Sequence, residues 1–297
     1  VAPVYQQNDL MIANLEVTLG GLEYGPYTAY PSFNSPDEIV PALRDAGVDI
    51  CLTANNHTYD MGSYGLIRTQ NVLDRVGIEY TGTRKSTDQS YILAKEVGKV
   101  KLGMICYTYE TGGGADYDKS LNYIPLYGDN ANLVNTFNYY DLETFYADAK
   151  KQLSAMDALG CDVKIFYLHW GDEYQDNPNE DQLDIAEKLA ELGVDVIVGG
   201  HPHVVQKFDV IKRADGHETL CLYSMGNELS NQRREYMNED DFRGYTEDGV
   251  VFIITIDKYN TGEAVISAVD VLPTWVQRDD SFEIIPLDPA LDEYSWP

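Results

Sequence analysis

Two histidines separated by a single proline form the most concentrated group of possible metal ligands in the chain. His201 and His203 flank Pro202 and follow the apolar run 194–198 and two glycines. Imidazole is the commonest metal ligand in proteins, and proline stiffens the tripeptide, so the two rings are held at a set separation. Taken alone, the motif has an alternative interpretation as a turn that carries histidines for other reasons.

Three other predicted strands, over residues 10–13, 48–54 and 163–168, are also followed at once by polar side chains. These side chains are Asn14 and Glu16, then Asn55, Asn56 and His57, and finally His169. Ligands of open α/β sheets bind outside the carboxyl ends of parallel strands, so we expect all four groups to meet at one edge. Each group has an ordinary alternative, such as a turn cap for an asparagine or a packed core position for His169. These alternatives do not account for all four strand ends together.

The chemistry of this set follows from its residue types. It combines histidine, asparagine and glutamate without cysteine, and such nitrogen and oxygen ligands suit Zn²⁺, Mn²⁺ or Fe. A bound metal lowers the pKa of water and generates a nucleophile at neutral pH, and two metals can hold both the attacking and the leaving oxygen of a phosphoryl group. The sequence therefore predicts one or two divalent metal ions and a hydrolytic reaction.

Periodicity and turn residues predict the elements that position these side chains. Helices are expected over residues 36–46, 64–76, 141–159 and 180–192, each followed by a glycine. Short strands are expected over 78–81 and 194–198, and hairpins over 91–107, 204–223 and 249–272. Residues 111–135 and 229–247 are expected to be loops, and the tail irregular. Alternating helices and strands up to residue 203, followed by strands, predict an α/β fold with a mixed sheet or two stacked sheets in one domain.

The composition excludes several classes of protein. The 297 residues carry a formal net charge of −28, which disfavours nucleic acid and makes a polyanionic substrate awkward unless bound metal offsets the field. No segment approaches the roughly 18 apolar residues that a membrane helix needs. The 23 tyrosines suit an exported protein. Residue 1 does not open a signal peptide, so we expect an N-terminal targeting or anchoring segment to be absent from this chain.

The four cysteines are expected to be unpaired. They are Cys51, Cys106, Cys161 and Cys221. They occupy or adjoin apolar runs, show no CxxC spacing, and belong to a chain too large to depend on a disulfide framework.

The ordered motifs resemble those of the bacterial capsule synthesis proteins of the CapA/PgsA type, the PGA_cap family of poly-γ-glutamate synthesis. The resemblance rests on Asn14-Leu15-Glu16, Ala54-Asn55-Asn56-His57 with Asp60 and Gly62, His169-Trp170-Gly171 with Glu173-Tyr174, Gly200-His201-Pro202-His203, Tyr223-Ser224-Met225-Gly226-Asn227, Pro273 to Arg278 and Ile285-Pro286-Leu287. The family is in turn similar to calcineurin-like metallophosphoesterases. That similarity implies a four-layer α/β/β/α sandwich, with two mixed sheets flanked by helices, and a two-metal site.

The resemblance also implies a role for each site residue. Glu16 takes the place of a metal-bridging acid, Asn56 is a metal-ligating amide, His169 and His201 bind one metal, and His203 binds the other. His57 is the acid that protonates the leaving group or binds its phosphate. Asp60 orients His57 or, alternatively, caps a helix. Asn14, Asn55 and Asn227 are assigned to substrate binding, with a plain turn role as the alternative for Asn227.

One departure from the family pattern concerns the first strand. The family opens with a strand that ends in Gly-Asp, whose aspartate binds metal, and residues 1–13 contain no such motif. The chain is therefore interpreted as one CapA-like domain over 1–297 that lacks its first strand. We expect an extracellular or cell-surface location, with capsule-synthesis membrane proteins as partners.

Two function classes remain open from the sequence. The first is a metal-dependent phosphoesterase-type hydrolase in capsule polymer metabolism. The second is a non-catalytic component that binds or guides poly-γ-glutamate during assembly and export. Metal-assisted hydrolysis of the polymer amide is a third possibility, because the same activated water can attack an amide.

Overall fold

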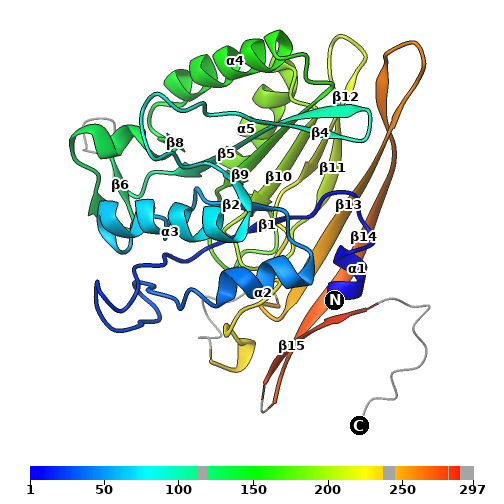
Figure 1. Ribbon diagram of the computed structural model, residues 1–297. Coiled ribbons are helices and arrows are strands. Elements are labelled where there is room, and N and C mark those ends of the chain that lie inside the picture. The colour runs from blue at the N-terminus through cyan, green and yellow to red at the C-terminus, as the bar shows by residue number, and fades with distance from the viewer. Residues whose placement is uncertain (113–118, 237–244, 280, 288–297) are drawn as a thin grey trace.

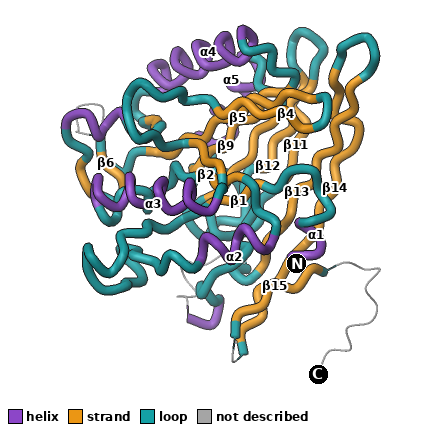
Figure 2. The backbone as a smooth tube through the Cα atoms, viewed as in Figure 1, coloured by secondary structure: helices purple, strands orange, loops and turns teal. Residues whose placement is uncertain are grey.

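Strands form the centre of the molecule, and helices lie on two sides of it. The computed structural model describes residues 1–112, 119–236, 245–279 and 281–287. Figures 1 and 2 show α4 and α5 together along the top, α2 and α3 along the lower front, and the strands between them. The described chain is thus a mixed α/β fold with sheets flanked by helices, as expected from the alternation of elements. The expected loops 111–135 and 229–247 fall partly outside the described residues.

The main helices end where the sequence places a glycine or a small residue. They are α2 (Ile39–Ala46), α3 (Gly62–Val76), α4 (Leu142–Ala158) and α5 (Glu180–Leu192), after the short α1 (Ala2–Tyr5). Gly47, Gly77 and Gly193 follow α2, α3 and α5 in the left-handed conformation that glycine adopts without strain. Among the described residues, no helix has both the length and the apolar character to cross a bilayer.

A parallel three-stranded sheet carries two of the four polar groups. Its strands are β1 (Ile12–Asn14), β2 (Ile50–Leu52) and β3 (Glu79–Thr81), in the order β1-β2-β3. The sheet is parallel throughout, so the residues that follow β1 and β2 leave it at the same edge. Asn14 ends β1, and Asn55 to His57 lie just beyond β2.

A seven-stranded mixed sheet carries the other two groups. Its order is β11-β12-β10-β9-β5-β4, with β8 paired to β5. The strands are β4 (Leu93–Val97), β5 (Val100–Tyr109), β8 (Thr136–Phe137), β9 (Val163–His169), β10 (Val196–Gly200), β11 (Phe208–Lys212) and β12 (Glu218–Leu222). Strands β5, β9, β10 and β12 are mutually parallel, and Gly200 lies opposite His169 in the register. His169, His201 and Asn227 therefore follow neighbouring strands at one edge.

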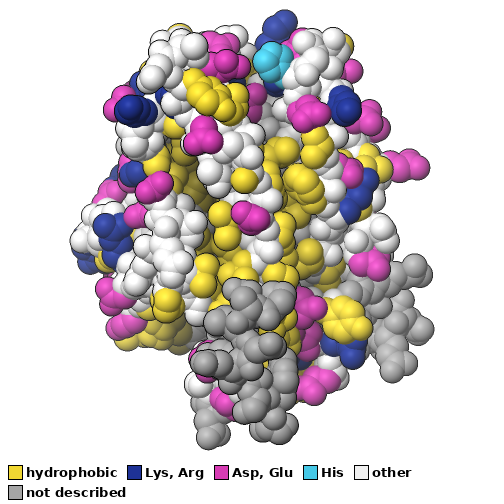
Figure 3. Space-filling view, turned by 90° about the vertical axis from the view of Figure 1, so that its right-hand side faces the viewer, with side chains coloured by type: hydrophobic (Ala, Val, Ile, Leu, Met, Phe, Trp, Pro, Cys, Tyr) yellow, Lys and Arg dark blue, Asp and Glu magenta, His cyan; other side chains and the backbone are white. Residues whose placement is uncertain are grey.

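A long hairpin forms a third sheet. Strands β13 (Asp248–Lys258), β14 (Ala264–Arg278) and β15 (Phe282–Pro286) pair antiparallel in that order. Figure 3 looks onto this side of the molecule, where hydrophobic side chains gather among acidic groups. Phe208, Val210 and Val271 are among the exposed hydrophobic residues.

Four buried clusters hold these elements together. One joins α4 and α5 to the seven-stranded sheet around Phe166, and another joins α2 and α3 to the three-stranded sheet around Leu73. The other two clusters lie between the two sheets, where Leu52 meets Tyr167, and Ile50 meets Val196 together with Phe252 of the hairpin. Burial of this apolar surface, at about 25 cal/mol per Å², fixes the two sheet edges relative to each other.

The structure corrects four expectations. The described residues form four sheets rather than two, because the β13–β15 sheet and the small β6 (Ser120–Leu121) and β7 (Ile124–Pro125) pair form separate ladders. The stretch 111–135 is therefore not all loop, and it also includes the 3₁₀ turn η1 (Gly128–Asn132). The tail contains β15 because residues 282–286 pair with β14. The predicted strand 204–211 begins only at Phe208.

Candidate metal centre

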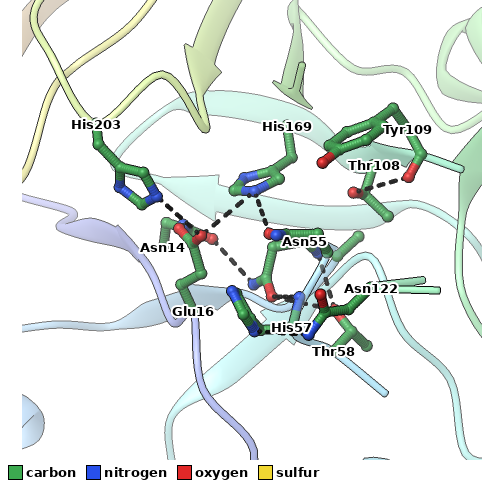
Figure 4. A network of polar contacts seen from close by, with 12 residues as sticks. Asn14, Glu16, Asn55, His57, Thr58, Thr108, Tyr109, Asn122, His169 and His203 are labelled. Atoms are coloured by element: carbon green, nitrogen blue, oxygen red, sulfur yellow. Dashed lines mark hydrogen bonds and ion pairs between the residues drawn. The ribbon is translucent and has the colours of Figure 1, made fainter. Parts of the chain in front are cut away.

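The carboxylate of Glu16 lies between two imidazoles. Its Oε1 atom is 3.5 Å from Nε2 of His169 and 3.7 Å from Nε2 of His203. Figure 4 shows both rings pointing at this carboxylate from the ends of different strands. Asn14 donates from Nδ2 to Glu16 Oε2 at 3.0 Å and so fixes the orientation of the acid. One carboxylate oxygen thus faces two histidine nitrogens, as expected for an acid shared between two metal positions.

Asn56 and His169 form a second close pair. Oδ1 of Asn56 lies 2.8 Å from Nε2 of His169, and both side chains are buried. Ligands of a first-row metal at about 2.1 Å lie about 3.0–3.4 Å apart for angles between 90° and tetrahedral. The separations of Asn56 and Glu16 from His169 Nε2 lie close to this range, so the three atoms can share one ion.

The His201-Pro202-His203 tripeptide turns sharply after β10. His201 has φ 99° and His203 φ 57°, in the left-handed region that residues with a Cβ seldom adopt. The His201 ring lies 4.8 Å from the His169 ring, centroid to centroid, and 6.1 Å from the His203 ring. The strained turn therefore brings all three imidazoles together.

Asn227 fixes the tautomer of His203. Its Nδ2 donates to the His203 carbonyl, to Gln232 and to the Thr246 carbonyl, which orients Oδ1 toward His203 Nδ1 at 2.9 Å. Nδ1 must then carry the hydrogen, so the lone pair of Nε2 faces Glu16. This arrangement is typical of a histidine whose free nitrogen binds a metal.

His57 is held by an acid rather than directed at the other histidines. Its Nδ1 lies 2.8 Å from Oδ2 of Asp60, and that oxygen also accepts from the Phe33 backbone N–H at 2.7 Å. The other Asp60 oxygen accepts from Nδ2 of Asn122 at 3.0 Å. Helix α3 has Met61 as its N-cap, without a side-chain cap bond, so the capping alternative for Asp60 is wrong.

Burial and neighbouring charges shift the pKa values of His57 and His201 in opposite directions. Burial lowers the pKa of His57, but the hydrogen bond and charge of Asp60 outweigh burial and raise its pKa above the ordinary value. Burial, with His169 and His203, lowers the pKa of His201 well below its ordinary value. His57 is thus adapted to carry a proton, whereas His201 is adapted to remain a neutral ligand.

Glu16 is held in its charged form. Burial alone would raise the pKa of its carboxyl, but the charges of His169 and His203 outweigh burial and hold the pKa well below its ordinary value. A carboxylate that stays ionised in a buried position is suited to bind a cation.

Three buried polar atoms in this cluster have no hydrogen-bond partner within the described structure. They are Glu16 Oε1, His169 Nδ1 and His201 Nδ1. A buried polar atom without a partner costs about 1–3 kcal/mol, so this concentration of three requires an explanation. Glu16, His169 and His201 offer ligand atoms within 4.8 Å of one another, which is the geometry of a metal site. The residues present therefore fit the predicted divalent metal.

Glu173 belongs to the same centre. Its carboxylate, His201 and His203 form a second group of ligand atoms within 4.8 Å of one another. The sequence placed Glu173 in a motif but gave it no role. Its position four residues after His169, in the loop beyond β9, was the available signal.

The remaining predicted site residues lie at the same edge. Asn55 is fully buried; it donates to the Leu15 carbonyl at 2.9 Å and its Oδ1 accepts from the His57 backbone N–H at 3.2 Å. It thus ties the Glu16 loop to the His57 loop. Contact of Asn14, Asn55 or Asn227 with a substrate stays a prediction. Tyr109, whose ring lies 4.8 Å from the His201 ring, and Asn122 were missed.

Comparison with known proteins identifies the family. The family model described as bacterial capsule synthesis protein PGA_cap matches residues 1–232. The chain belongs to this family. The PGA biosynthesis protein CapA of Bacillus subtilis is 26% identical over 94% of this chain and 67% of its own length. The capsule biosynthesis protein CapA of Bacillus anthracis is 26% identical over 88% of this chain and 55% of its own length. The chain thus spans between about half and two thirds of these PGA_cap relatives.

A solved structure was also compared. The sulfate thiohydrolase SoxB of Thermus thermophilus, in complex with glycerol, aligns with a TM-score of 0.42 and 13% identity over 84% of this chain and 35% of that chain. This likeness is too weak to assign a shared fold.

Proposed function

We propose that this chain is a metal-dependent hydrolase of the phosphoesterase type that acts in poly-γ-glutamate capsule biosynthesis at the cell surface. The observation that carries the proposal is the Glu16 carboxylate between His169 and His203, with unpartnered ligand atoms around it. Membership of the capsule synthesis family and the names of its CapA relatives support the biological setting. We also propose that residues 1–297 form one domain and that the packed layers form an α/β/β/α sandwich of metallophosphoesterase type.

The proposed ligand set divides between two positions. Asn56, His169 and His201 would hold one divalent ion, His203 with Glu173 would hold the other, and the Glu16 carboxylate would be shared between the two positions. The metal identity is Mn, Fe or Zn, since the donors are nitrogen and oxygen atoms without thiolate. When bound, such a metal lowers the pKa of water and offsets the negative charge of a phosphoryl group.

His57 and Asp60 supply the proton in the proposed reaction. A water oxygen forms a bond to phosphorus as the P–O bond to the leaving group breaks, and the proton that this water loses passes to solvent. His57, held protonated by Asp60, gives its proton to the departing oxygen. Asn14 keeps the Glu16 carboxylate oriented through its hydrogen bond to Oε2.

The alternative is a non-catalytic component that binds or guides the polymer during export, together with other capsule-synthesis membrane proteins. The names of the relatives, which refer to biosynthesis, favour this alternative. The net charge of −28 counts against tight binding of a polyanion.

The test is metal analysis followed by a substrate screen. The purified protein is loaded with Mn²⁺, Fe²⁺ or Zn²⁺, and its metal content is measured by mass spectrometry. Turnover is then measured with p-nitrophenyl phosphate, bis-p-nitrophenyl phosphate and γ-glutamyl-p-nitroanilide. We expect metal binding and phosphoester turnover. Bound metal without turnover of any phosphoester, together with measurable poly-γ-glutamate binding, would favour the alternative. Turnover of the anilide alone would indicate amide hydrolysis.

A further inference from the structure

A tight turn beside His57 is hydrogen-bonded to the loop that precedes α2. Asn122 and Tyr123 connect β6 to β7, with φ 48° and 60°, a conformation that asparagine tolerates better than most residues. Nδ2 of Asn122 donates to the Pro31 carbonyl at 2.9 Å and to Asp60 at 3.0 Å. Figure 4 shows Asn122 next to His57. The turn is therefore fixed to the loop before α2 on the side of the site that His57 occupies.

The turn and the loop before α2 each carry an exposed tyrosine next to the hydrogen bonds of Asn122. Tyr30 precedes Pro31 and is 80% exposed, and Tyr123 follows Asn122 and is 82% exposed. They are the two most exposed large hydrophobic residues of the described structure. A single exposed aromatic needs no explanation, but two of them on loops that are tied together beside a reactive histidine do.

Two further tyrosines lie against the histidines of the site. The Tyr109 ring is 4.8 Å from the His201 ring, and the Tyr174 ring is 6.0 Å from the His203 ring, nearly parallel to it. Burial raises the pKa of Tyr109, and the nearby Tyr123 adds to that effect. Burial raises the pKa of Tyr174, with a contribution from Tyr30. Tyr30 and Tyr123 adjoin the Asn122 hydrogen bonds beside His57, and Tyr109 and Tyr174 lie against His201 and His203. We term these four residues the tyrosine rim.

The charge around the rim selects against a second anionic group. The ion pairs of the histidines here are all with acids, His57 with Asp60 and both His169 and His203 with Glu16. A carboxylate or second phosphate beyond the reacting group would face the exposed carboxylate of Glu173, which lies within 4.8 Å of the His201 and His203 ligand atoms.

We propose that the tyrosine rim binds an uncharged aromatic ring in the leaving group of the substrate. This inference rests on the proposed phosphoesterase function, because His57 then marks the leaving-group side. Aromatic rings stack on tyrosine in offset or edge-to-face arrangements, and the exposed Tyr30 and Tyr123 lose water when a ring covers them. The substrate is then an aryl or nucleoside phosphoester whose only negative charge lies on the reacting phosphoryl group.

Binding of phosphonates to the Mn²⁺-loaded protein tests this proposal without turnover. Isothermal titration compares methylphosphonate, phenylphosphonate and 4-carboxyphenylphosphonate. We expect phenylphosphonate to bind about tenfold more tightly than methylphosphonate, as stacking of one ring allows, and the added carboxylate to remove most of that gain. Tyr123→Ala and Tyr30→Ala should reduce the preference for the phenyl ring and leave methylphosphonate affinity unchanged, whereas Tyr123→Phe should keep it.

The matched control is Tyr140→Ala, which removes a tyrosine that is 67% exposed between β8 and α4. It should change none of the three affinities. Equal affinities for methyl- and phenylphosphonate, no binding of either, or an equal loss in Tyr140→Ala would overturn the proposal. Phenyl phosphate turnover, measured on the same samples, separates the two proposals. A preference for the phenyl ring without turnover would support ring binding by the tyrosine rim and refute the hydrolase function. Turnover without a preference for the phenyl ring would support the hydrolase function and refute ring binding by the rim.

Discussion

His169 and Asn56 are 113 residues apart in the sequence, and His169 Nε2 lies 2.8 Å from Asn56 Oδ1. They follow strands of two different sheets, β9 and β2. Their contact therefore reports that the carboxyl ends of both sheets meet at one place. Any change that separates the sheets would separate this pair, and with it the proposed ligand set.

Replacement of His57 and of His201 should have different effects. His57→Ala should slow phosphoester turnover by about 10²–10⁴-fold while metal content is kept, because a general acid is lost. His201→Ala should lose metal and turnover together, because a ligand is lost. Metal content by mass spectrometry and turnover of p-nitrophenyl phosphate are measured for both variants. If His57→Ala loses metal as completely as His201→Ala, His57 is a ligand and its assigned role is wrong.

Glu173 should contribute to the second metal position. Glu173→Gln removes the negative charge of a side chain whose carboxylate lies within 4.8 Å of His201 and His203 ligand atoms. We expect the bound metal to fall by about one ion per chain, or its affinity to fall 10–100-fold. Equilibrium dialysis measures both quantities. Glu187→Gln, on the exposed face of α5, is the matched control, and equal stoichiometry together with equal affinity in the two variants would contradict the assignment.

The stability of the metal-free protein should have a maximum near the ordinary pKa of histidine, about 6.5. The raised pKa of His57 means that the folded protein binds more protons above this pH, so stability falls as pH rises through that range. The lowered pKa of His201 means that the unfolded chain binds more protons below it, so stability also falls as pH falls. Urea unfolding from pH 5.5 to 8 in the presence of a chelator measures both slopes.

Two variants separate these contributions. His57→Gln should flatten the decline above pH 6.5, and His201→Gln should flatten the decline below it. His217→Gln, which changes an exposed histidine outside the site, should alter neither slope. A single slope shared by all four proteins would refute the assignment of opposite shifts.

The cysteines should all be present as thiols that react slowly in the folded protein. The described structure contains four free cysteines, as the sequence predicted, of which Cys161 is the least buried. Burial raises the pKa of Cys51 to about 12, and it raises the pKa of the others. Because the thiolate is the reactive form, titration with Ellman's reagent should modify Cys161 first. All four should react in denaturant without a reductant.

Gly199 should not tolerate even one methyl group. A Cβ at this position would lie 2.0 Å from the Tyr223 carbonyl oxygen and 2.4 Å from Nε1 of Trp170, which donates a hydrogen bond to that oxygen. Gly199→Ala should therefore lower the free energy of unfolding by about 1–3 kcal/mol or more. At Gly25 a Cβ would meet nothing within 4 Å, so Gly25→Ala is the control in urea unfolding. Equal stabilities would contradict the close approach.

Local signals were sufficient for most elements. The predicted helix 180–192 matches α5 from Glu180 to Leu192, because Asn179 and Gln182 form a capping box and Gly193 ends the helix with φ 104°. The helix predicted from residue 36 begins only at Ile39, since helix ends are the least certain part of such patterns. The expected meeting of the groups around Glu16, His57, His169 and His201 was conditional on parallel strands, and the strands are parallel within each of the two sheets.

Contacts made by irregular segments could not be predicted in this way. Asn122 lies 65 residues from His57, in a stretch without hydrophobic periodicity, and its position depends on the burial of Leu121 and Leu126. Glu173 and Tyr174 follow β9 in a loop whose course is fixed by the bond from Tyr174 N–H to the Pro202 carbonyl at 2.7 Å. Such contacts arise from long-range packing, which no local pattern encodes.

The positive φ angles of His201 and His203 destabilise the fold at two positions where the proposed chemistry requires histidine. Glycine adopts this conformation freely, whereas a residue with a Cβ loses about 1–3 kcal/mol there. Selection for folding alone would favour glycine or asparagine in place of both histidines. A laboratory selection for thermal stability should therefore accumulate substitutions at this tripeptide and discard the function, and variants that keep the histidines should gain their stability elsewhere.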